Sequence, residues 1–88
     1  MISIEAIDNN SFKVSVSKDF LTEHIVLLSD RFHQDVCKHK LTKTELITKS
    51  FEFLLDRESN QSILKKFNLE VISQYFPEYI DEVKKFIL

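Results

Sequence analysis

The sequence predicts an α+β fold in which a two- or three-stranded antiparallel sheet is followed by four or five short helices. Two observations predict it. Apolar and polar residues alternate near the start of the chain, as in half-buried strands, whereas apolar residues recur at helical spacing in the second half. The chain has 88 residues, 43% hydrophobic and 30% charged, which suits one soluble domain, residues 1–88. Within it we expect a β-rich part, residues 1–28, and a helical part, residues 29–88.

Residues 2–6 and 12–17 are expected to form a β-hairpin. Both segments alternate between apolar and polar residues, and Phe12, Val14 and Val16 share one face of the second segment. The residues between them, 8–10, read Asp-Asn-Asn, which favours a turn because these side chains bond to nearby backbone and tolerate unusual dihedral angles.

Residues 20–40 allow two interpretations. Leu21, Ile25 and Leu28 fall at helical spacing with later apolar residues, so one long helix is possible. Residues 22–28, however, are rich in β-branched and aliphatic side chains, and Ser29 can cap a helix that starts after it. We favour a strand at 22–28 and a helix at 29–38, because an isolated hairpin is only marginally stable.

The second half is expected to be helical. Thr42 and Glu45 match a capping box, and apolar residues follow at helical spacing as far as Leu55. Residues 63–67 are expected to form a short helical segment. Asn68 can cap another that runs to residue 76, and Pro77 suits the first turn of a last helix.

The chain contains no glycine. A P-loop, a dinucleotide-binding turn and a serine-hydrolase nucleophile elbow all need glycine, so their usual forms are excluded. Any turn with a positive φ is therefore expected at Asn or Asp.

Three further features of the sequence bear on location and membrane contact. The longest aliphatic run, Ile25 to Leu28, is too short to span a membrane, and the first residues do not resemble a targeting segment. The single cysteine, Cys37, excludes a disulfide scaffold and suits a reducing compartment. We therefore expect a cytoplasmic protein that does not contact a membrane.

His33, Cys37 and His39 form one candidate site for chemistry. The four-residue spacing places His33 and Cys37 on one helical face, where they could bind zinc or act as a base and a nucleophile. A structural zinc site needs a fourth ligand, and a helix C-terminus disfavours a thiolate. We therefore expect a buried thiol, with no catalytic, metal-binding or cofactor-binding residue.

The other charged patterns are weaker. Asp56 and Glu58 flank Arg57 among polar neighbours, which favours an exposed helix end with a local ion pair over acid–base chemistry. Ser62 and Lys65 match a β-lactamase spacing whose companion motifs are missing. A basic patch could be formed by Lys38, Lys40, Lys43, Lys49, Lys65 and Lys66. The isoelectric point near 5.9 argues against a nucleic-acid partner.

Tyr75 and Tyr79 are the candidate partner contacts, because tyrosine is enriched at interfaces and both lie close to Pro77. We expect a non-enzymatic protein-binding or assembly module, whose partner is another protein or a second copy in a homodimer. The alternatives are a nucleic-acid-binding regulator and a thiol- or metal-dependent enzyme that uses Cys37 with His33 or His39.

The segments SFEFLLDRE at 50–58, SIL..F at 62–67, VI at 71–72 and YFPEY at 75–79 resemble a family of short uncharacterised bacterial proteins. The resemblance covers about residues 22–79. The family often has a glycine-containing turn where this chain has Lys38, His39 and Lys40, and a proline where it has Ser59. The resemblance implies a bacterial, cytoplasmic protein with strands before helices. It implies no activity, cofactor or site residue.

Overall fold

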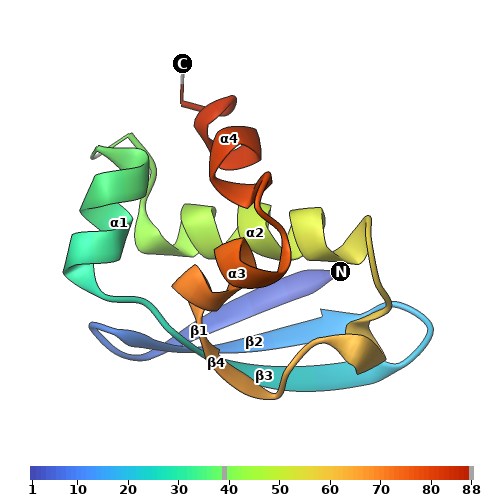
Figure 1. Ribbon diagram of the computed structural model, residues 1–88. Helices are drawn as coiled ribbons and strands as arrows, with labels where there is room; N and C mark the ends of the chain where they lie inside the picture. Colours follow the sequence, from blue (N-terminus) through green and yellow to red (C-terminus); the bar gives the residue numbers. More distant parts are fainter. Residues whose placement is uncertain (39, 88) are drawn as a thin grey trace.

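The computed structural model describes residues 1–38 and 40–87, which form a mixed four-stranded sheet with the α-helices on one face (Figure 1). The strands are β1 (Ile2–Asp8), β2 (Ser11–Ser17), β3 (Leu21–Leu27) and β4 (Lys66–Asn68). They lie in the order β1-β2-β3-β4, with the first three antiparallel and β4 parallel to β3. The α+β class is therefore confirmed.

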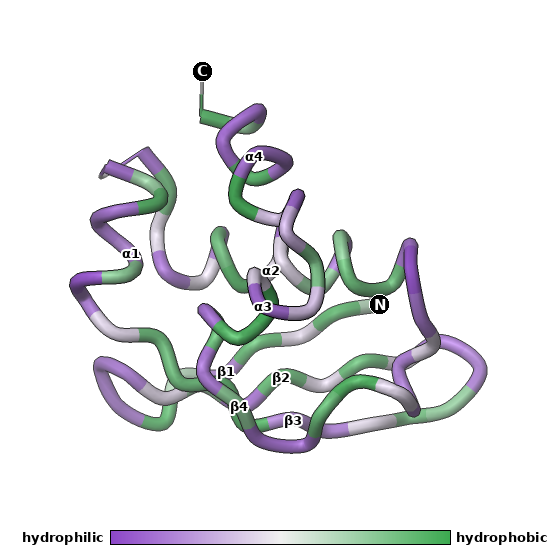
Figure 2. The backbone as a smooth tube through the Cα atoms, viewed as in Figure 1, coloured by the Kyte–Doolittle hydropathy of each residue, from purple (hydrophilic) through white to green (hydrophobic). Residues whose placement is uncertain are grey.

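The predicted hairpin is confirmed, and its register follows from alternation along the strands. Ile4 lies opposite Val14, which lies opposite His24 on β3. Phe12, Val14 and Val16 point to the buried side of β2, and the change between hydrophilic and hydrophobic residues is visible along the strands in Figure 2. At the turn, the backbone N–H of Asn10 donates to the Asp8 carboxylate at 2.8 Å, as expected of an Asx turn.

The strand-then-helix interpretation of residues 20–40 is also confirmed. Helix α1 (Asp30–Cys37) begins after Ser29, whose hydroxyl accepts from the Phe32 N–H at 3.1 Å. Helix α2 (Lys43–Leu55) begins with the predicted capping box: Thr42 and Glu45 each accept a hydrogen bond from the other's backbone N–H. These caps satisfy N–H groups that the first turn of a helix leaves free.

The second half is less helical than predicted. It holds α3 (Ile72–Tyr75), α4 (Tyr79–Lys84) and the 3₁₀ turns Asn60–Ser62 and Leu69–Val71, but residues 66–68 form β4. The expectation of a helical segment at 63–67 and of at most three strands, all antiparallel, is therefore wrong. A three-residue strand carries no measurable periodicity, and the pairing that defines β4 is with β3, about 40 residues earlier in the chain. Pro77 lies in the turn before α4 rather than in its first turn.

The core lies between the sheet and α2, and continues between α2 and α4. Figure 1 shows α4 on the side of α2 that faces away from the sheet. Phe51 on α2 is fully buried and its ring contacts His24 on β3 and Phe67 on β4. On the other side of α2, the buried Tyr79 hydroxyl donates to Ser50, whose own hydroxyl donates to the Leu46 carbonyl. Helix α2 is therefore buried on two faces.

The expectation that a positive φ would fall on Asn or Asp is wrong. Among residues 1–38 and 40–87, Lys38 alone has a positive φ, 48°. It ends α1 in the left-handed conformation, and its N–H donates to the Gln34 carbonyl at 2.8 Å. Glycine is the usual residue here because it has no Cβ to clash. The glycine-free chain places lysine there at a cost of about 1 kcal/mol.

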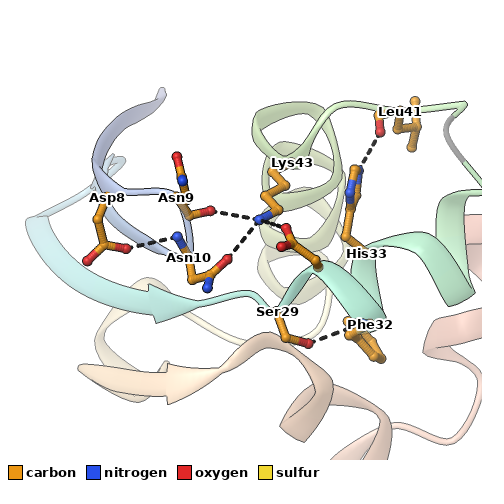
Figure 3. A network of polar contacts seen from close by, with 9 residues as sticks. Asp8, Asn9, Asn10, Ser29, Phe32, His33, Leu41 and Lys43 are labelled. Atoms are coloured by element: carbon orange, nitrogen blue, oxygen red, sulfur yellow. Dashed lines mark hydrogen bonds and ion pairs between the residues drawn. The ribbon is translucent and has the colours of Figure 1, made fainter.

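Lys43 joins three parts of the fold (Figure 3). Its ammonium donates to the Asn9 carbonyl at 2.7 Å and to the Asn10 side chain at 2.9 Å, and it also pairs with Asp30. The first residue of α2 thus holds the β1–β2 turn and the first turn of α1. The hydrogen bond from Lys43 lowers the pKa of the Asp30 carboxyl.

Candidate functional site

An open pocket of about 330 Å³ lies beside α3, between the C-terminal end of α2 and residues 62–67. We call it the α3 groove. Its volume is near the lower end of the range for ligand pockets, about 300 to 1,000 Å³. Glu58, Ser62 and Tyr75 bring polar groups to it. The rest of the lining is apolar and consists of Leu54, Ile63, Leu64, Phe67, Val71, Ile72 and Phe76.

One wall of the groove is formed by residues 62–64, and the buried Asn60 just before them fixes this segment. The Asn60 amide nitrogen donates to the Phe20 carbonyl at 2.8 Å and to the Thr22 hydroxyl at 3.0 Å. These acceptors belong to the β2–β3 turn and the start of β3, so one side chain attaches this segment to the sheet. Immediately beyond it, Ile63 is buried whereas Leu64 remains 48% exposed at the groove.

His24 makes the second attachment. It is buried, and its Nδ1 lies 2.8 Å from the Leu64 carbonyl while its Nε2 lies 3.0 Å from the Thr22 hydroxyl. A carbonyl oxygen only accepts, so Nδ1 donates to it. The neutral imidazole carries a single proton, so in that form Nε2 accepts from Thr22. The donors therefore run in one direction, from Asn60 to Thr22 to His24 to the Leu64 carbonyl. This chain of bonds sets the backbone at the mouth of the groove.

Glu58 supplies the charge at the groove. Its side chain is partly buried, and none of the ion pairs found among residues 1–38 and 40–87 involves it. The neighbouring Arg57 is engaged elsewhere: its guanidinium pairs with Glu78 at 3.3 Å and lies over the Phe53 ring. The expected local ion pair of Arg57 with Asp56 or Glu58 is therefore wrong. Among the described residues Arg57 pairs instead with Glu78, in the turn before α4.

The two candidate tyrosines have different environments. Tyr75 lines the groove and is 66% exposed, so it is placed where a partner could reach it. The prediction that Tyr79 is a surface contact is wrong, because Tyr79 is fully buried against Phe53 and Ser50. The Tyr79 hydroxyl can be buried because Ser50 accepts its hydrogen bond. Desolvation raises the pKa of the Tyr79 hydroxyl far above its ordinary value of 10.0.

His33 and Cys37 are both engaged in contacts that stabilise the fold. His33 Nε2 donates to the Leu41 carbonyl at 2.6 Å (Figure 3), which closes the connection between α1 and α2. The Cys37 thiol is fully buried, and burial, with a smaller contribution from the Glu45 carboxylate, raises its pKa. His39 lies outside the described residues. Within the described part of the chain, no group of three His, Cys, Asp or Glu side chains is placed to hold a metal.

The candidate basic patch is partly occupied by contacts within the chain. Lys43 is held by Asn9, Asn10 and Asp30, as described above. Lys49 pairs with Glu52 at 3.5 Å, and its ammonium lies over the Phe86 ring. Each of these two lysines already has an acidic partner, which leaves less cationic surface for phosphate than the sequence suggested.

Sequence reasoning placed Tyr75 at a partner-binding surface but did not find the groove. The groove is built from residues that are brought together by β4 and by the hydrogen bonds of Asn60 and His24. Neither the strand pairing nor these hydrogen bonds leave a local pattern in the sequence. One signal was available for Tyr79: it lies four residues before Val83, and both are buried on one face of α4.

No family model, curated protein or solved structure matches this chain. The resemblance to a bacterial family therefore remains a prediction. Within residues 1–38 and 40–87, none of the helices has the length and apolar character that crossing a bilayer requires.

Proposed function

We propose that this protein is a non-enzymatic binding module, whose α3 groove takes an apolar side chain of a protein partner beside a cationic one. The observation that carries the proposal is a pocket whose lining is mostly apolar and includes one carboxylate, Glu58, that has no ion-pair partner among the described residues. An apolar anchor fills the pocket, and a neighbouring Lys or Arg of the partner pairs with Glu58.

The rim favours a protein over a small molecule. Leu64 and Tyr75 are 48% and 66% exposed, although both are large apolar or amphipathic side chains. A ligand confined to the pocket would leave their outer surfaces in water. A protein surface covers them as well, and tyrosine is enriched among the residues that contribute most of the binding energy at protein interfaces.

The non-enzymatic part of the proposal is supported by the way the candidate reactive groups are used. His33 holds a loop carbonyl, and the pKa of the buried Cys37 thiol is raised, which opposes formation of the nucleophilic thiolate. We also propose a cytoplasmic location, which a lone free thiol suits.

Selection from a displayed library of short helical peptides tests the proposal. We expect enriched peptides to combine a bulky apolar residue with Arg or Lys one helical turn away. Replacing Tyr75 with Ser should weaken binding of a selected peptide by about tenfold or more, because truncating an anchoring tyrosine removes its contact area.

The matched control is Phe20→Ser, since Phe20 is exposed to a similar extent, 57%, and does not line the groove. It should bind the peptide as the unmodified protein does. Enriched peptides without a cation, or peptides that bind the folded Tyr75→Ser variant equally well, would contradict the proposal.

A further inference from the structure

The outer edge of β1 has backbone groups available for another strand. β1 lies at the end of the sheet, and within residues 1–38 and 40–87 it pairs only with β2. Met1 and Ser17 exchange both backbone hydrogen bonds, at 2.6 and 2.9 Å. In an antiparallel pair such bonded positions alternate, so Ser3 and Glu5 also bond to β2. The N–H and C=O groups of Ile2, Ile4 and Ala6 therefore point away from the sheet.

This edge has few of the features that normally prevent strands from pairing. Residues 2–8 contain no lysine and no proline, and the irregularity in pairing lies at the end of the strand, between Ala6 and Asp8. The opposite edge is different, because β4 has only three residues, begins at Lys66 and follows Lys65. Strand addition is therefore expected at β1 and not at β4.

We propose that two copies of this chain pair through β1, antiparallel about Ile4, to form one continuous sheet. This register places Ile4 opposite Ile4 of the second copy and Ile2 opposite Ala6, so all three outward-pointing residues bond. It places Ser3 opposite Glu5. A register centred on Glu5 would instead oppose two carboxylates, which is unfavourable.

The side chains on the inner face support a second copy as the occupant. Ile2 and Ile4 are only partly buried, packed against the edge of the core beneath α2. Antiparallel pairing centred on Ile4 relates the two copies by a two-fold axis. It brings the same apolar side chains of both copies together and continues the core across that axis. The α3 groove is lined by β4, at the other end of the strand order, so the dimer leaves two grooves open. This inference does not depend on the function proposed for the groove.

Sedimentation and amide hydrogen exchange, measured from micromolar to millimolar concentration, test the pairing. The amides of Ile4 and Ala6 should become protected as the concentration rises. Those of Ser3 and Glu5, already bonded to β2, serve as internal references. A protein that stays monomeric throughout, or a dimer in which the Ile4 amide exchanges freely, would overturn the proposal.

Charge substitutions at Ser3 test the register itself. Ser3→Glu opposes Glu5 at two symmetric places and should weaken the dimer about two- to thirtyfold, whereas Ser3→Lys should strengthen it. Ser3 is exposed, so folding should be unaffected. The control Ser17→Glu puts the same charge on an exposed residue of β2 and should leave the dissociation constant of the dimer unchanged. A dimer insensitive to the charge at Ser3 would rule out this interface.

Discussion

Replacing Phe51 with alanine is expected to lower the free energy of unfolding by about 3 to 5 kcal/mol. The ring is fully buried, 5.5 Å from the His24 ring and 6.2 Å from the Phe67 ring between centroids. Strands β3 and β4 are held by backbone hydrogen bonds and cannot move in to fill the space. A protein of this size has a total stability of about 4 to 13 kcal/mol, so the variant should lie close to the unfolding threshold.

Urea denaturation followed by circular dichroism measures the effect. The control is Phe20→Ala, because Phe20 is 57% exposed and should cost no more than about 0.5 kcal/mol. A loss at Phe51 that is no larger than the loss at Phe20 would show that α2 does not pack against the sheet in this way.

Raising the pH above about 10 is expected to destabilise the protein through Tyr79. The folded state raises the pKa of the buried hydroxyl above its ordinary value of 10.0, which the unfolded chain regains. At lower pH both states keep the proton, and this contribution to stability is fully present. Above that pH the unfolded chain loses the proton first, so stability falls by about 1.4 kcal/mol per pH unit.

The Tyr79→Phe variant isolates this effect. At neutral pH it should be less stable by about 1 kcal/mol, because the hydrogen bond to Ser50 is lost. By about pH 11 the order should reverse, since phenylalanine cannot ionise. Parallel urea titrations between neutral pH and pH 11 measure the difference. If the difference in free energy of unfolding between the two proteins did not change with pH, the Tyr79 hydroxyl would not be buried.

Local patterns were enough to predict the first half of the fold. The hairpin follows from period-two alternation around an Asp-Asn-Asn turn, and the start of α2 follows from Thr42 and Glu45, three residues apart. In both cases the interacting groups are close in the chain. The same applies to the cap at Ser29, which decided between a strand followed by a helix and one long helix.

Features that depend on distant contacts could not be predicted in this way. Strand β4 exists because Lys66 to Asn68 pair with β3, and its three residues have no detectable period. The groove depends on Asn60 reaching a turn 40 residues away and on His24 reaching the Leu64 carbonyl. Tyr79 was misplaced because its polar end suggested the surface, whereas Ser50, 29 residues earlier, accepts its hydrogen bond in the core.

The proposal that the α3 groove is the binding site can be tested most directly by a double-mutant cycle between Glu58 and the cation of a selected peptide. Binding is measured for the unmodified protein and for Glu58→Gln, each with the peptide and with its Arg→Gln analogue. If the cation pairs with Glu58, the loss of Arg should weaken binding to the unmodified protein by about fivefold and have little effect on Glu58→Gln, a coupling of about 1 kcal/mol. Equal losses with both proteins would contradict the assignment of the groove as the binding site.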